Sequence, residues 1–390
     1  MTISRFPIEK LQSLPTPFYY YDMELLRSTI KAVCQQAQEP NLHVHYALKA
    51  CVAPPVLQQM AKSGFGADCV SGGEVDAALK AGIPPEKIVF AGVAKADWEI
   101  RLALERNIYC FNVESLPELE NINLLAGETG KRARVALRIN PNVDAHTHRY
   151  ITTGLQEDKF GIAMQDMLPA VKRCVALPNI DFIGLHFHIG SQITDMNPYK
   201  ELCLRINELV NRVETSGIRV DYINVGGGLG VDYEEPDQHA IPDFHSYFDI
   251  FRRYLHARTD QQVHFELGRS LVAQMGSLMT RVLYVKQGVD KQFCIVDAGM
   301  TDLIRPALYH ASHKIENLTA TTATEELYDV VGPICESSDV FLTHYRMPAT
   351  RRGDLLAIRT AGAYGETMAS GYNLRRLPGH ITSDELNKNI

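Results

Sequence analysis

The 390-residue chain has no long apolar run, no run of basic residues and no low-complexity segment. No stretch approaches the roughly 18 apolar residues of a membrane span, and Met1 to Pro7 lack an apolar signal region. We therefore expect no membrane contact and a cytoplasmic location. A formal net charge of −7 without a basic cluster argues against a nucleic-acid partner, so the expected ligand is a small molecule.

Closely spaced cysteine pairs are also absent. The eight cysteines are scattered without a Cys-x-x-Cys motif, at positions 34, 51, 69, 110, 174, 203, 294 and 335. This distribution is typical of reduced thiols in a cytosolic protein and predicts no structural zinc site.

Short apolar segments rich in β-forming residues alternate with helical patterns from about residue 43 to residue 269. The predicted strands are 43–49, 65–71, 88–93, 108–114, 133–140, 180–190, 222–228 and 263–269. Amphipathic segments between them include 56–62, 74–81, 98–106 and 199–215. Eight strand and helix units at this spacing predict a TIM (β/α)8 barrel, and a doubly wound open sheet is the alternative.

After residue 277 the pattern changes to strand-like runs without clear helices, at 278–286, 292–297, 327–334 and 355–360. They predict a separate, mostly antiparallel β domain. The run at 17–21 precedes the barrel and is a candidate to pair with this second sheet. We therefore expect a barrel domain at 25–275 and a β domain made of 1–24 and 276–390.

Lys49 ends the apolar segment that begins at His43. Alternation along a strand would place Lys49 on the same face as His43, His45 and Ala47, pointing into the barrel. A partly desolvated ammonium has a lowered pKa, so the amine can form a Schiff base with an aldehyde cofactor or a carbonyl substrate. A lysine that merely extends to solvent from a strand end is the alternative.

Two histidines, His186 and His188, alternate with apolar residues in the sixth strand and are expected to face inward. Buried imidazoles need partners. A shared metal ion is possible, but no accompanying carboxylate or cysteine ligands stand out, and we predict no metal site. An aromatic platform for a planar cofactor is better supported.

Three glycines, Gly226 to Gly228, follow the seventh strand and expose backbone amides that can bind a phosphate. The spacing does not match a dinucleotide-binding motif. The loops after strands 7 and 8 of a TIM barrel are a recurrent phosphate site, although a merely flexible loop is the alternative.

The eighth strand carries Glu266 inward and ends near Arg269. A buried carboxylate must be protonated or paired. A protonated ring nitrogen would be one partner, and an ion pair with Arg138 is the alternative. A lysine for an aldehyde, glycines for a phosphate, a carboxylate for a pyridinium nitrogen and a histidine for a ring face together indicate pyridoxal 5'-phosphate.

These residues resemble the fold-type III pyridoxal-phosphate decarboxylases over essentially the whole chain. Three short motifs of that family correspond to 46–50, 186–192 and 226–230, and longer segments typical of one branch correspond to 140–148, 154–161, 305–309 and 332–339. One departure is Leu267, where the family usually has proline. The change affects the path of the loop more than the expected role of Arg269.

The resemblance implies a barrel and β domain of the alanine racemase and ornithine decarboxylase type, assembled as a homodimer with active sites at its interface. It assigns cofactor binding to Lys49, His188, Ser191, Gly226, Gly227, Gly228, Glu266, Gly268, Arg269 and Tyr364. It assigns substrate binding to Arg269, Arg305, Tyr309, Glu336 and Tyr364. Lys49 and Cys335 would be catalytic, with Cys335 contributed by the second copy as the proton donor.

The activity implied by the resemblance is decarboxylation of meso-2,6-diaminopimelate to L-lysine and carbon dioxide. Glu266 is expected to keep the ring nitrogen protonated, whereas racemases of similar fold place an arginine there. Decarboxylation of carboxynorspermidine and a regulator that binds the cofactor without catalysis are the alternatives.

Overall fold

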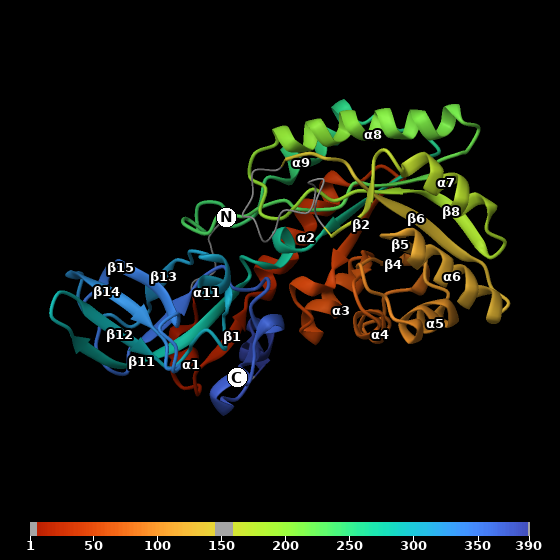
Figure 1. Ribbon diagram of the computed structural model, residues 1–390. Coiled ribbons are helices and arrows are strands. Elements are labelled where there is room, and N and C mark those ends of the chain that lie inside the picture. The colour runs from red at the N-terminus through yellow and green to blue at the C-terminus, as the bar shows by residue number, and fades with distance from the viewer. Residues whose placement is uncertain (1–5, 145–158, 389–390) are drawn as a thin grey trace. The chain divides into compact units, whose positions relative to one another are not determined.

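The computed structural model describes residues 6–144 and 159–388 (Figure 1). The chain divides into two units. The barrel unit contains Ile30–Gly230 and Asp243–Gly268, and the β unit contains Met1–Thr29, Val231–Pro242 and Arg269–Ile390. These bounds differ from the predicted ranges mainly in the short segment Val231–Pro242, which joins the β unit although it lies within the predicted barrel range.

Parallel strands form a closed barrel within the described residues. The strands are β2 (Leu42–Ala47), β3 (Gly66–Cys69), β4 (Ile88–Phe90), β5 (Cys110–Val113), β6 (Ala133–Asn140), β8 (Ile180–His186), β9 (Tyr222–Asn224) and β10 (Gln262–Leu267). They are hydrogen-bonded in the order β5-β4-β3-β2-β10-β9-β8-β6, and pairing of β5 with β6 closes the ring. The predicted barrel is therefore confirmed and the open sheet is wrong. The short strand β7 (Ile162–Ala163) adds to β6 outside this ring.

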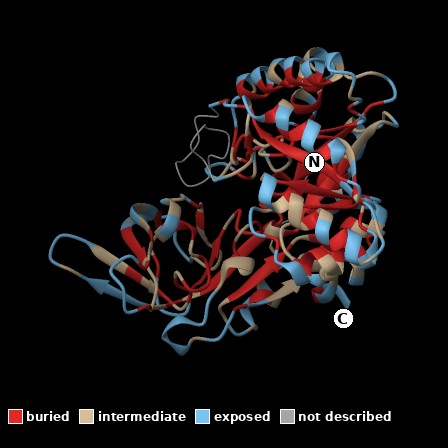
Figure 2. Cartoon of the chain, turned by 45° about the vertical axis from the view of Figure 1, so that its right-hand side comes forward, coloured by how far each residue is buried: buried red, intermediate tan, exposed pale blue. Residues whose placement is uncertain are grey.

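Helices alternate with the strands of the barrel unit. They are α3 (Pro54–Lys62), α4 (Gly72–Lys80), α5 (Asp97–Arg106), α6 (Leu116–Glu128), α7 (Met167–Ala176), α8 (Asn197–Thr215) and α9 (Phe244–Tyr254), preceded by α2 (Met23–Gln36). Each helix that follows a strand buries an apolar stripe, and Figure 2 shows buried strands with exposed outer helix faces. No helix among the described residues is long and apolar enough to cross a membrane.

Polar and aromatic side chains fill much of the barrel interior. Imidazole rings of His43, His45 and His264 stack near the amino-terminal ends of the strands, with centroids of His43 and His264 4.7 Å apart. His45 Nδ1 lies 3.1 Å from the carbonyl oxygen of Lys87, so this nitrogen carries the proton. His45 Nε2 then accepts from His264 Nδ1 at 2.7 Å. Both rings are neutral in this arrangement.

The β unit contains a mostly antiparallel sheet, as predicted. Its strands are β1 (Phe18–Tyr21), β11 (Gly276–Gln287), β12 (Gln292–Val296), β13 (Ile315–Asn317), β14 (Glu325–Val331), β15 (Val340–Pro348), β16 (Leu355–Ile358) and β17 (Gly379–Thr382). Among the described strands of the β unit, only the pairs β12–β14 and β1–β17 are parallel. Strand β1 pairs with β11, which confirms the prediction that residues 17–21 join this sheet.

Short helices complete the β unit: α1 (Ile8–Gln12), α10 (Arg269–Val272), α11 (Arg305–Tyr309) and α12 (Ser383–Lys388). An apolar core joins elements far apart in the sequence, since Leu11, Phe18, Met279, Leu355 and Leu386 pack together. The motif segments 140–148 and 154–161 extend into residues 145–158, which lie outside the described residues.

We predict that acid destabilises the barrel through its buried histidines. Burial lowers the pKa of His45 from 6.5 to about 4. The unfolded chain therefore binds a proton between these values that the folded chain does not. Stability should be greatest above pH 6.5, and the free energy of unfolding should fall by roughly 3 kcal/mol as the pH drops through this window.

Urea denaturation at a series of pH values measures this loss. His45→Gln, which keeps hydrogen-bonding atoms but cannot titrate, should show a shallower dependence on pH. An equal slope in the two proteins would exclude His45 as a source of the acid sensitivity.

Candidate active site

Lys49 lies in a short 3-10 turn, Leu48–Ala50, directly after β2. The prediction that it continues the alternation of the strand is wrong, because β2 ends at Ala47 and the tighter turn changes the direction of the side chains. The turn still places Lys49 at the carboxyl end of the barrel strands, where TIM-barrel active sites lie. Its Nζ is 3.4 Å from Oδ2 of Asp68, at the carboxyl end of β3.

Asp68 was not predicted as a site residue. Its side chain is buried, and Oδ1 has no hydrogen-bond partner within the described part of the chain. Burial raises the pKa of Asp68 to about 6; the nearby charge of Glu266 adds to the rise, and Lys49 opposes it. The available signal was an acidic residue inside an otherwise apolar strand segment, at the end of the barrel where chemistry occurs.

Glu266 extends from β10 into the barrel and is held by three side chains. Asn112 Nδ2 and Asn224 Nδ2 donate to its Oε1 at 3.1 and 2.7 Å. His186 Nε2 donates to its Oε2 at 3.1 Å. Sequence reasoning placed His186 and Glu266 inward but did not identify either asparagine.

The alternative partner for Glu266, Arg138, is instead paired elsewhere. Arg138 Nη1 donates to Oε1 of Glu114 at 2.8 Å, and its guanidinium lies 4.7 Å from the ring centroid of Phe160. Glu114 Oε2 also accepts the backbone N–H of Gly161 at 2.9 Å. The predicted alternative of an ion pair between Arg138 and Glu266 is therefore wrong.

The surroundings of Glu266 favour its ionised form. Burial by itself would raise the pKa of this carboxyl, but the hydrogen bond and charge of His186, with the ammonium of Lys49, hold its pKa well below the usual range. A carboxylate that stays charged inside a barrel can pair with a cationic ring nitrogen of a bound ligand.

His188 follows β8 and contacts the glycine loop. Its Nδ1 accepts the N–H of Gly227 at 3.3 Å, so the proton of the neutral ring is on Nε2. Burial, followed by the positive charges of Arg138 and Lys49, lowers the pKa of His188 well below its usual value. A neutral planar ring at this position is suited to stacking on a planar ligand.

The glycine loop, Gly226 to Gly228, has a path that side chains would block. A Cβ at Gly226 would lie 2.4 Å from the carbonyl oxygen of Phe187, and one at Gly227 would lie 1.8 Å from that of Glu266. Gly226 and Gly228 also have positive φ angles of 73° and 101°. Gly226 and Gly227 are buried, and their N–H groups donate to Oδ1 of Asn224 at 2.9 Å and to Nδ1 of His188 at 3.3 Å. The prediction that the three glycines expose consecutive amides is therefore wrong for these two residues.

The segment that contains Ser191 lies beside this loop. Ile193 N–H donates to the carbonyl oxygen of Gly228 at 2.9 Å, and Ile193 forms a bridge with Leu229. Gly268 follows β10 directly. These contacts bring the predicted phosphate-binding segments together within the barrel unit.

A second group of predicted residues gathers in the β unit around two buried arginines. Arg269 Nη1 donates to the hydroxyl of Tyr233 at 2.5 Å, and its guanidinium lies 4.9 Å from the ring centroid of Tyr364. Arg305 lies 5.4 Å from the ring of Tyr233 and 5.8 Å from that of Tyr309. Tyr233 was not predicted, since a single tyrosine in a loop gives no signal of this role.

Arg305 has no carboxylate partner among the described residues. Its Nε donates to Nε2 of His313 at 3.4 Å, and burial lowers the pKa of the guanidinium. Burial also lowers the pKa of His313 to about 3, so this ring is neutral and offers no charge compensation. Two buried cations close together favour an anionic ligand.

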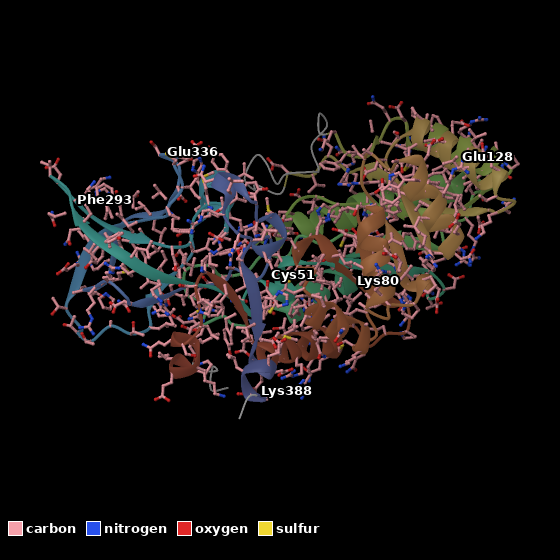
Figure 3. All side chains as sticks on the ribbon, turned by 90° about the horizontal axis from the view of Figure 1, so that it is seen from below. Cys51, Lys80, Glu128, Phe293, Glu336 and Lys388 are labelled. Atoms are coloured by element: carbon pink, nitrogen blue, oxygen red, sulfur yellow. The ribbon has the colours of Figure 1, made fainter. Side chains whose placement is uncertain are left out.

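Cys335 and Glu336 lie in the loop between β14 and β15, and both are exposed, as Figure 3 shows for Glu336. Cys335 N–H donates to Oδ1 of Asn373 at 3.1 Å. The Tyr372 hydroxyl donates to Oε1 of Glu336 at 2.8 Å. Within the β unit, these contacts tie the predicted proton donor to the segment that begins at Tyr372.

The predicted residues thus form three groups. The barrel unit brings together Lys49, His188, Ser191, Gly226, Gly227, Gly228 and Glu266. The β unit holds the arginine group and, as a separate set of contacts, the loop of Cys335 and Glu336. In the described ranges, no cluster of three or more His, Cys, Asp or Glu side chains has the geometry of a metal site.

The chain is similar to known decarboxylases over nearly its full length. Residues 26–273 match the family described as pyridoxal-dependent decarboxylase, pyridoxal binding domain. A diaminopimelate decarboxylase from Bacteroides thetaiotaomicron is 59% identical over 98% of this chain and 99% of its own length. A diaminopimelate decarboxylase from Helicobacter pylori (strain J99) is 43% identical, covering 94% of this chain and 90% of its own.

Solved structures give the same result. The crystal structure of diaminopimelate decarboxylase from Helicobacter pylori complexed with L-lysine has a TM-score of 0.90 at 41% identity, covering 96% of this chain and 93% of that one. A lysine/ornithine decarboxylase from Vibrio vulnificus, at 23% identity and a TM-score of 0.80, shares the fold. The chain therefore belongs to the pyridoxal-dependent decarboxylase family, among the diaminopimelate decarboxylases.

Proposed function

We propose that this chain decarboxylates meso-2,6-diaminopimelate to L-lysine and carbon dioxide, with pyridoxal 5'-phosphate as its cofactor. The observation that carries the proposal is the buried, ionised Glu266, held by Asn112, Asn224 and His186 within the electrostatic influence of Lys49. The similarity to proteins named diaminopimelate decarboxylase supports the choice of substrate.

The residues of the barrel unit fit this cofactor. The glycine loop can keep its path beside the segment of Ser191 only because no Cβ is present at Gly226 and Gly227, where one would collide with neighbouring backbone. Lys49 would hold the aldehyde carbon, His188 the ring face and Glu266 the ring nitrogen. Ser191 and Gly226 to Gly228 would bind the phosphate, with Gly268, Arg269 and Tyr364 completing the site. Bound pyridoxal phosphate supplies an electron sink for the pair of electrons left when carbon dioxide departs.

Asp68 is suited to manage the proton of the Lys49 amine. Its Oδ2 lies 3.4 Å from Nζ, within reach of an ammonium. Because burial raises the pKa of Asp68 to about 6, its carboxylate and the amine differ less in proton affinity than they would in water. Asp68 would therefore hold the ammonium of Lys49 whenever that amine is released from the cofactor.

The arginine group would orient the substrate. Arg305 lacks a carboxylate partner in the described structure, and we assign it, with Arg269 and Tyr309, to a substrate carboxylate. Tyr364 would contact both substrate and cofactor. Glu336, an exposed carboxylate, would bind the distal ammonium of the substrate.

Cys335 would donate the proton from its Sγ to the carbon that has lost its carboxyl group. We propose that it acts in the active site of a second copy in a homodimer. The exposed apolar side chains of Tyr372, Leu374 and Leu377 support this assembly, since Asn373 in the same segment contacts Cys335. The cytoplasmic location stays a prediction.

Decarboxylation of carboxynorspermidine is not favoured, because the similar relatives are named diaminopimelate decarboxylase. A regulator without catalysis is also disfavoured, because a protein that only binds the cofactor has no need for a carboxylate beside the Lys49 amine or for two buried arginines.

The proposed reaction can be assayed directly. Purified protein supplied with pyridoxal phosphate should release carbon dioxide and L-lysine in equal amounts from meso-diaminopimelate. Carboxynorspermidine, assayed in parallel, should not be turned over. Turnover of carboxynorspermidine alone would reassign the substrate, and no turnover of either compound despite bound cofactor would support a regulator.

Substitution of Cys335 tests the proposed proton donor. Cys335→Ala should lower kcat by about a hundredfold or more, the usual contribution of a general acid, while the cofactor absorbance band is unchanged. Cys34→Ala removes the other exposed thiol and should leave kcat unaltered. Wild-type turnover by the Cys335→Ala protein would remove this thiol from the mechanism.

Substitution of Arg305 tests the proposed contact with the substrate carboxylate. Arg305→Gln should raise KM for the substrate by about ten- to a hundredfold, the cost of losing a charged hydrogen bond to a carboxylate. Arg346→Gln, at an exposed position of the same unit, is the matched control and should leave KM unchanged. If KM is equal in both variants, Arg305 does not bind the substrate.

A further inference from the structure

Asn224, the last residue of β9, uses every polar atom of its side chain inside the barrel. Its Nδ2 donates to Oε1 of Glu266 at 2.7 Å and to the hydroxyl of Tyr222 at 2.7 Å. Its Oδ1 accepts the backbone N–H of Gly226 at 2.9 Å. The side chain has no exposed surface.

The partners fix the orientation of this amide. The carboxylate of Glu266 can only accept, and the N–H of Gly226 can only donate, so nitrogen and oxygen cannot be exchanged. The side chain is therefore a rigid connection between the carboxylate of Glu266 and the first turn of the glycine loop. This loop needs such support, since Gly226 has a positive φ of 73°.

Backbone contacts strengthen the same connection. Glu266 N–H donates to the carbonyl oxygen of Gly226 at 2.8 Å, and Val225 N–H donates to that of His264 at 2.9 Å. The glycine loop and β10 are thus joined on both sides of Asn224. A shift of the loop would alter the hydrogen bond that Glu266 receives.

We propose that Asn224 is a positioning residue that couples the two ends of the cofactor site. It holds the glycine loop in the path that binds the phosphate, and it holds Glu266 charged and aligned for the ring nitrogen. The inference rests on the proposed cofactor. Asn224 acts through Glu266 and Gly226, and it is not assigned a contact with the cofactor.

Asn112 provides a matched comparison. It is equally buried and donates to the same oxygen of Glu266 at 3.1 Å. Its side-chain oxygen accepts a long hydrogen bond from Sγ of Cys110 at 3.9 Å. Asn112 therefore supports Glu266 without a hydrogen bond to the glycine loop. Substituting each asparagine in turn separates the effect on the ring-nitrogen end of the cofactor site from the effect on its phosphate end.

The experiment compares pyridoxal phosphate with pyridoxal, which lacks the phosphate. Absorbance titrations of the full-length protein give Kd for each, and their ratio measures what the phosphate contributes to affinity. Asn112→Ala should weaken both ligands by a similar factor and leave the ratio at the wild-type value. Asn224→Ala should weaken both and also reduce the ratio by about tenfold, the cost of a mispositioned hydrogen bond to a charged group.

An unchanged ratio in Asn224→Ala would overturn the inference, and so would equal reductions in both alanine variants. Asn224→Asp keeps an oxygen that can accept the N–H of Gly226 but replaces the amide donor with an acid beside Glu266. It should therefore weaken both ligands and keep the wild-type ratio, and a tenfold reduction of the ratio would contradict the proposal. Far-UV circular dichroism and thermal melts verify that each variant is folded. Absence of pyridoxal phosphate binding by the wild-type protein would instead refute the proposed function.

Discussion

The charge of Glu266 is the constraint on which the barrel interior depends. An ionised carboxylate removed from water costs several kcal/mol unless its oxygens are well satisfied. Here the donors come from β5, β8 and β9, while β10 supplies the carboxylate. The register of four strands is therefore tied to one group, and a slip of one residue in any of them would break at least one of these hydrogen bonds.

Buried polar groups nearer the amino-terminal ends of the strands are satisfied without charge. His45 and His264 are paired through neutral tautomers, which avoids a second buried charge. The ring of Tyr222 lies 4.2 Å from that of His264, its hydroxyl accepts from Asn224, and it packs with Val89, Cys110 and Ala136 in an apolar cluster. The interior thus combines one charged level at the catalytic end with a neutral hydrogen-bonded level at the other, in place of the branched apolar side chains usual in such barrels.

The fold could be predicted because its signals are periodic and repeated. The strand from Ala133 to Asn140 was predicted with the bounds observed, and the change of pattern after residue 277 separated the second sheet. Lys49 shows where periodicity fails, since a strand pattern gives no sign of the turn that ends it. Sequence reasoning missed Asp68, Asn112 and Asn224. A single polar residue in a buried strand gives the same sequence pattern whether it supports the structure or belongs to the site.

Partner choice is a second limit of sequence reasoning. Glu266 was correctly expected to need a partner, but Arg138 pairs with Glu114 and the partners of Glu266 are neutral amides and an imidazole. Charge alone made the arginine the obvious candidate. In the folded barrel, the position of each side chain along its strand decides whether it can contact Glu266. Only donors at the same height in the barrel as this carboxylate can reach it. The chemistry of such a site follows from the register of the strands, which is a property of the whole sheet and of no single motif.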